Sequence, residues 1–139
     1  MYDLVEFLYA PPARRSTPAI LAWWERRRLA YNAFVGAAGM VSLGAVGAAG
    51  VLLGEGVNLV GGLAGAAVFG VMANVCYFLG PATEVVLEKL WGRRVLPAGP
   101  VLYRMGLTFS VGLALFPTLL VVMLMTARLV LGVLGLRWD

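Results

Sequence analysis

Three long apolar stretches dominate the pattern of the chain. Positions 29–54 and 57–80 are apolar throughout except for scattered polar, uncharged residues, and Glu55 is the one charge between them. A third apolar run, 101–127, follows a charged connector. A helix needs about 20 apolar residues to cross a bilayer. The pattern therefore predicts an all-α integral membrane protein with three transmembrane helices in a single membrane domain, 1–139.

Polar segments flank these spans. Residues 1–28 are expected at the interface, and their first part, Tyr2–Tyr9, is either a short interfacial helix or a partly ordered tail. Ser16-Thr17-Pro18 is typical of a helix start, with a hydroxyl cap and a proline in the first turn. Trp23, Trp24 and the arginines after them are expected to lie among lipid headgroups.

Small residues recur at four-residue spacing in the first two spans, and the turn between these spans is very short. Small residues let helix backbones approach closely, which matters in lipid because the hydrophobic effect does not drive helices together there. We therefore expect a tight antiparallel hairpin of spans one and two. The expected packing residues are Ala33, Ala37, Ala45, Ala49, Gly50, Gly54, Gly61, Gly62, Gly65, Ala66 and Gly70.

Proline and arginine residues set the other expected boundaries. Pro81 is expected to end span two, so that 81–100 forms a cytoplasmic amphipathic connector with Glu84 at the surface. Pro117 is expected to kink span three. At mid-membrane Arg128 would cost about 2.5 to 3.5 kcal/mol, so we place it near the interface, followed by an interfacial tail, 128–139.

Composition and charge agree with a membrane location. Hydrophobic residues make up 61% of the 139 residues and charged residues 13%, whereas a soluble domain is about a quarter charged. The net charge is +4, and the arginines and lysine are concentrated before span one and between spans two and three. This asymmetry predicts a cytoplasmic N-terminus, and it assigns the positive charge to topology and lipid contact rather than to nucleic acid.

Enzymatic chemistry has little support in the sequence. The chain contains no histidine and one cysteine, Cys76, which excludes histidine-based nucleophilic catalysis, the HExxH zinc signature and histidine-ligated haem. The glycines lie in apolar runs without the ending of a phosphate-binding loop. We therefore expect no catalytic, metal or cofactor site. A lipid-modifying enzyme would require an essential Glu55 or Glu84.

A group of polar residues is expected at the cytoplasmic end of the first two spans. In an antiparallel hairpin, the residues that open span one come level with those that close span two. This group either binds a lipid headgroup or only fixes the register of the hairpin. Its members are Arg26, Arg27, Arg28, Tyr31, Asn32, Asn74 and Tyr77.

The segments Trp24–Asn32 and Ala73–Gly80 resemble a pattern found in small multi-span bacterial membrane proteins of uncharacterised function. The resemblance covers about a fifth of the chain, and it implies a compact multi-span protein of the bacterial cytoplasmic (inner) membrane. It implies no activity and no functional residue.

Two functions follow as hypotheses. The first is a non-catalytic membrane subunit that acts through helix packing, either in a larger complex or as a homo-oligomer. The alternative is an oligomeric pore or a membrane-perturbing effector. The alternative requires Asn58, Asn74 and the Thr108–Ser110 segment to face a shared water-filled axis. The expected partners are the lipid bilayer and other membrane-protein chains.

Overall fold

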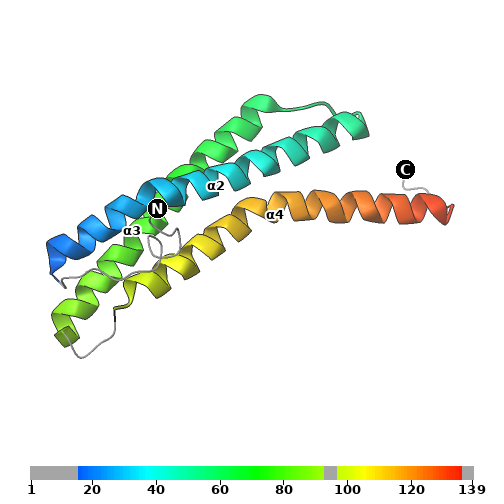
Figure 1. Cartoon of the computed structure of the whole chain (residues 1–139). Coiled ribbons are helices and arrows are strands. Elements are labelled where there is room, and N and C mark those ends of the chain that lie inside the picture. Colours follow the sequence, from blue (N-terminus) through cyan, green and yellow to red (C-terminus); the bar gives the residue numbers. More distant parts are fainter. Residues whose placement is uncertain (1–15, 93–96, 136–139) are drawn as a thin grey trace, which may run out of the picture.

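The computed structural model describes residues 16–92 and 97–135, and three helices make up most of them. These are α2 (Thr17–Leu53), α3 (Leu59–Trp91) and α4 (Gly99–Val133) (Figure 1). Each helix is long and apolar enough to cross a membrane, so the prediction of three apolar helices is confirmed and indicates a multi-pass membrane protein. The Tyr2–Tyr9 segment and the last residues of the expected tail 128–139 lie outside the described residues, while α4 continues past Arg128 to Val133.

The start of α2 and the turn after it follow from local sequence. Ser16 is the N-cap and Pro18 lies in the first turn, as predicted, although the Ser16 side chain makes no capping bond. After α2 the chain reverses through Gly54 and Gly56, which have φ angles of 72° and 76°. Only glycine adopts this left-handed conformation readily. A Cβ on Gly50 would lie 2.5 Å from the Gly56 carbonyl oxygen, so the turn needs a glycine there as well.

The expected helix break at Pro81 is wrong, because α3 continues through Pro81 to Trp91 as one helix. The end of span two within this helix stays a prediction. The proline removes one backbone hydrogen bond, but contacts with α2 hold the helix on both sides of it. Before Pro81, Gly80 packs against the Trp24 ring, and after it Glu84 bonds to the same side chain. Tertiary contacts thus override the local preference of proline.

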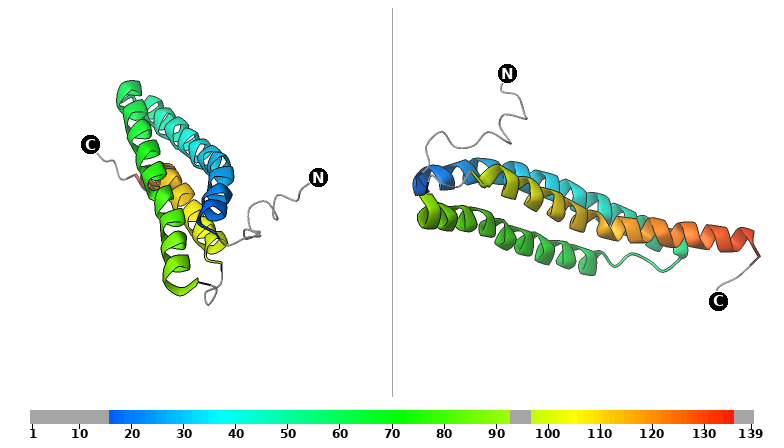
Figure 2. Two further views of the ribbon diagram at one scale, coloured as in Figure 1. Left: turned by 90° about the vertical axis from the view of Figure 1, so that its left-hand side faces the viewer. Right: turned by 90° about the horizontal axis from the view of Figure 1, so that it is seen from below.

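α2 and α4 run in the same direction, and α3 runs against both (Figure 1). At the end where α2 starts, the first half of α4 packs beside both α2 and α3, which also contact each other directly (Figure 2). α2 contacts α4 more extensively than it contacts α3, its partner in the expected hairpin. α4 is continuous through Pro117, and the expected kink there stays a prediction.

A hydrogen bond from α2 reaches α4 beside Pro117. The Ser42 hydroxyl donates to the Ala114 carbonyl at 2.5 Å and lies 2.8 Å from the Thr118 hydroxyl. A proline weakens the backbone bonding of the preceding helical turn. The carbonyl that loses its partner to Pro117 is that of Leu113, and Ser42 bonds to the next one along the helix. Ser42 therefore holds α2 against α4 close to the proline.

Buried side chains concentrate at one end of the molecule. The main cluster of buried residues comprises Ile20, Trp23, Trp24, Tyr31, Val35, Ala73, Tyr77 and Tyr103. At the other end, large apolar side chains such as Leu52, Val60 and Val133 are exposed. The 37 residues of α2 extend about 55 Å, which is longer than the bilayer core of about 30 Å. The molecule therefore has a densely packed end and an apolar end with fewer contacts between helices.

Candidate functional site

The packed end is built around an aromatic cluster, which we define as Trp23, Trp24, Tyr31, Tyr77 and Tyr103. Neighbouring rings meet edge to face or tilted, and the centroid distances range from 4.7 Å for Tyr31–Tyr77 to 6.1 Å for Trp23–Tyr103. The rings come from all three helices. Such pairs contribute about 0.5 to 1.5 kcal/mol beyond the burial of their area. The cluster therefore fixes how the three helices meet.

A buried carboxylate accompanies the aromatic cluster. Trp24 Nε1–H donates to Glu84 Oε2 at 2.7 Å, and Glu84 is only 3% exposed. The expectation that Glu84 lies at the surface is therefore wrong. Gly99 lies against this carboxylate, and a Cβ there would come within 2.9 Å of the Glu84 carboxyl carbon. Glu84 thus joins α2, α3 and the first residue of α4.

Tyrosine hydroxyl groups bind backbone carbonyls across the helices. Tyr77 donates to the Trp24 carbonyl at 2.6 Å, and Tyr31 donates to the Ala73 carbonyl at 3.2 Å. Tyr31 also lies 2.7 Å from the Ser110 hydroxyl, which connects it to α4. Hydrogen bonds of this kind satisfy the buried polar groups. These tyrosine bonds hold the three helices in position, and the donors and acceptors in them are paired with one another.

The arginines beside the cluster lie in different environments. Trp23 and Trp24 are 6% and 2% exposed, so their expected position among lipid headgroups is wrong. Arg27 is also buried: it donates to the Trp23 carbonyl at 3.1 Å, and its guanidinium stands 3.8 Å from the centroid of a Trp23 ring. Arg28 is partly exposed, pairs with Glu25 at 3.3 Å, and lies over the Phe78 ring. Because α3 and α4 reach this end of α2, its aromatic face packs on protein.

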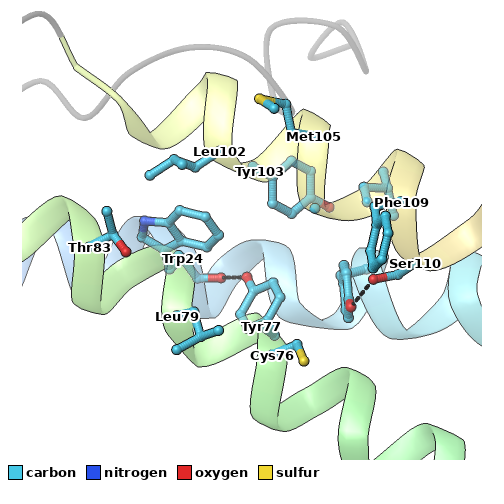
Figure 3. A pocket seen from close by; sticks show the side chains of 14 residues that line it. Trp24, Cys76, Tyr77, Leu79, Thr83, Leu102, Tyr103, Met105, Phe109 and Ser110 are labelled. Carbon is cyan, nitrogen blue, oxygen red and sulfur yellow. Dashed lines mark hydrogen bonds between the residues drawn. The ribbon is translucent and has the colours of Figure 1, made fainter.

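A cavity of about 260 Å³ lies beside the cluster, between α3 and α4 (Figure 3). Trp24, Tyr77 and Tyr103 point toward one another at its inner side, while Cys76, Met105 and Phe109 also line it. The lining is mostly apolar. Two of its polar residues, Tyr31 and Ser110, are bonded to each other across α2 and α4.

A larger groove separates α2 from α3 in the apolar part of the molecule. We call it the glycine groove; it has a volume of about 650 Å³. Gly36 and Gly39 line it on α2, Gly65 and Gly70 line it on α3, and α4 contributes Pro117. A Cβ on any of these four glycines would meet no atom of the described residues within 4 Å. Two amide side chains, Asn32 and Asn74, lie at one end of the groove.

The predicted packing residues fall in three environments. Ala49 is buried, while Ala45, Gly50, Gly62, Ala66 and Gly70 are half-buried, and Ala33, Ala37, Gly54, Gly61 and Gly65 are exposed. Gly62 packs close to Leu43 of α2, and Gly54 serves as the left-handed end of α2. Gly65 and Gly70 line the glycine groove and do not pack against another helix.

The predicted polar group is divided between two places. Arg27, Tyr31 and Tyr77 are buried in the packed end. Arg26 and Asn32 are exposed, and Asn74 is half-buried and donates to the Gly70 carbonyl at 3.0 Å. Tyr103, Ser110 and Ser42 also join helices, although no pattern in the sequence indicates this role. The buried face of α3 includes Ala73, Tyr77, Pro81 and Glu84, which recur at helical spacing. If the helix is assumed to continue past Pro81, this spacing predicts that Glu84 is buried.

Comparisons of the chain with protein-family models, with curated proteins and with solved structures find no match. Inferences about function therefore depend on the geometry of the chain itself.

Proposed function

We propose that the protein is a non-catalytic subunit of a membrane assembly, which it enters through the outward face of α2. This face carries Ala33, Ala37, Gly44 and Ala48 at helical spacing, and all four are exposed. It lies opposite the buried face that includes Tyr31, Val35, Ala38, Ser42 and Ala49. The outward face therefore remains accessible to another helix in the bilayer.

The observation that carries the proposal is Gly44. A Cβ at this position would meet no described atom within 4 Å, so nothing within the described chain requires a glycine. Glycine costs about 1 kcal/mol relative to alanine in a helix interior. Three alanines at helical spacing on the same face make a surface that allows close helix approach. A partner helix packed on this face explains why the cost is tolerated.

Several polar groups on which the pore hypothesis relied make bonds within the chain. The Asn58 side chain accepts from the Gly61 amide at 2.8 Å, and Ser110 is buried against Tyr31. Asn74 bonds to the backbone of its own helix. These bonds favour the subunit hypothesis over the pore hypothesis.

We also propose that the protein lies in a bacterial inner membrane with the arginine-rich end of α2 in the cytoplasm, as the positive-inside rule predicts.

Native mass spectrometry of the protein extracted gently from its own membrane tests the proposal. We expect either a homo-oligomer of defined number or a complex with other polypeptides, and a Gly44→Leu variant should lose this assembly. Gly112→Leu on α4 is the matched control, because Gly112 has the same free space but its exposed neighbours at helical spacing, Phe109 and Phe116, are large and do not allow close helix approach. A wild-type protein that is always monomeric, or equal loss in both variants, would refute the role of this face.

A further inference from the structure

We infer that the glycine groove binds one anionic phospholipid, with an acyl chain along the groove and the phosphate near Arg28 and Asn32. The inference does not depend on the proposed assembly, because the groove lies on a different face of α2. Three features support it: the size of the groove, the chemistry of its lining, and the charge at one end.

The length and the apolar lining of the groove suit an extended hydrocarbon chain. The lining on α2 extends from Asn32 to Val46, a distance of about 21 Å at the helical rise. The groove has a volume of about 650 Å³, and the glycines on both walls contribute no side chain to fill it.

The lining of the groove is apolar along most of its length and polar at one end. Phe69, Leu113 and the glycines line the apolar part, and Gly36 and Gly65 are exposed, so the groove opens on the surface. Asn32 and Asn74 form the polar end. A membrane lipid has the same order of parts, with a polar headgroup joined to an apolar chain.

Positive charge lies next to this polar end. Arg28 precedes Asn32 by one helical turn, so the two share a face of α2. The Arg28 guanidinium stands 4.4 Å from the centroid of the Phe78 ring. Phe78 lies one helical turn after Asn74 on α3. Arg28 is also partly exposed and pairs with the exposed Glu25 at 3.3 Å. Basic pockets between membrane helices bind anionic headgroups, and arginine binds phosphate through paired hydrogen bonds.

The position along the helix axis is consistent with a lipid in one leaflet. The groove is about 21 Å long, which exceeds the half of the roughly 30 Å bilayer core that one leaflet contributes, so an acyl chain of one leaflet fits within its length. The arginines lie beyond the Asn32 end of the groove, where a headgroup belongs. Moving an acyl chain from the bilayer into the groove contributes little binding free energy, because both surroundings are apolar. Selectivity for one lipid must therefore come from the headgroup contacts.

The test is native mass spectrometry of the full chain in mild detergent, titrated with phosphatidylglycerol or with phosphatidylcholine of the same acyl chains. We expect one phosphatidylglycerol to be retained per chain in preference to phosphatidylcholine. Arg28→Gln should reduce this preference about fivefold. Gly65→Leu, whose side chain enters the groove, should weaken retention of either lipid by about tenfold or more.

Two further variants keep the test decisive. Gly39→Leu fills the groove from the opposite wall and should reproduce the loss even if Gly65→Leu folds poorly. Gly44→Leu adds the same side chain outside the groove and should retain the lipid. Equal retention of the two lipids by the wild-type chain, or unchanged retention in both groove variants, would overturn the inference. Loss of assembly in Gly44→Leu with lipid retained would separate this site from the assembly face.

Discussion

The indole Nε1–H of Trp24 donates to the buried Glu84 carboxylate at 2.7 Å, although the two residues are sixty positions apart in the chain. The bond joins α2 to the part of α3 beyond Pro81. Glu84 also lies against Gly99, at the start of α4. This contact therefore determines how the packed end of the molecule assembles.

Replacing Trp24 with phenylalanine should destabilise the protein. The substitution retains an aromatic ring but removes the donor to a buried carboxylate, and hydrogen bonds to charged groups contribute about 1.5 to 3 kcal/mol. We expect a loss in that range in the free energy of unfolding, measured by denaturant titration in detergent. Trp91→Phe is the matched control, because Trp91 is 53% exposed, and it should change stability by no more than about 0.5 kcal/mol. Similar losses in both variants would contradict a special role for the Trp24–Glu84 bond.

Adding a single methyl group at Gly80 should also destabilise the fold. A Cβ there would overlap the six-membered part of the Trp24 ring, which is held between α2 and α3. Overpacking of this kind costs about 1 to 3 kcal/mol. Thermal unfolding followed by circular dichroism should therefore show a lower midpoint for Gly80→Ala.

The same change at Gly106 is the control for this prediction. A Cβ at Gly106 meets no described atom within 4 Å, so Gly106→Ala should be neutral or stabilise by up to about 1 kcal/mol through helix propensity. A Gly80→Ala protein as stable as the wild type would mean that Trp24 can move without cost.

The long apolar runs predicted three helices because their length and composition leave few alternatives in a chain of this kind. The interior of the packed end was harder to predict. Glu84 and Trp24 are polar or amphipathic residues near span ends, where water or headgroups are the usual surroundings. Their burial depends on how all three helices meet at this end, which no local pattern in α2 or α3 encodes.

The small residues show a related limit. Spacing of four predicted that these residues share helix faces, but spacing does not say which helix, if any, covers a face. Gly62 packs near Leu43, Gly65 lines the groove, and Ala37 faces outward, although all three belong to similar repeats. The outcome depends on the angle between α2 and α3, which long-range contacts such as the Tyr31–Ala73 bond determine.

The Tyr31–Ser110 contact should show measurable coupling between α2 and α4. The two hydroxyl groups lie 2.7 Å apart in a buried position. Hydrogen bonds between membrane helices contribute about 0.6 kcal/mol on average and up to about 1.7. A double-mutant cycle with Tyr31→Phe and Ser110→Ala should give a coupling energy in this range, with Thr126→Ala as a third site that does not couple to Tyr31.

The orientation of the molecule can be tested by cysteine labelling in a Cys76→Ser background. The α2–α3 turn contains Glu55, while Trp91 ends α3 at the opposite end of the molecule, and both are exposed. The arginines near Trp91 predict that this end is cytoplasmic. A membrane-impermeant maleimide added to right-side-out vesicles should therefore label Glu55→Cys at once, and Trp91→Cys only after the vesicles are permeabilised. The reverse pattern would place the arginine-rich end outside the cytoplasm. Labelling of both sites in sealed vesicles would show that the helices do not separate these two ends across the membrane.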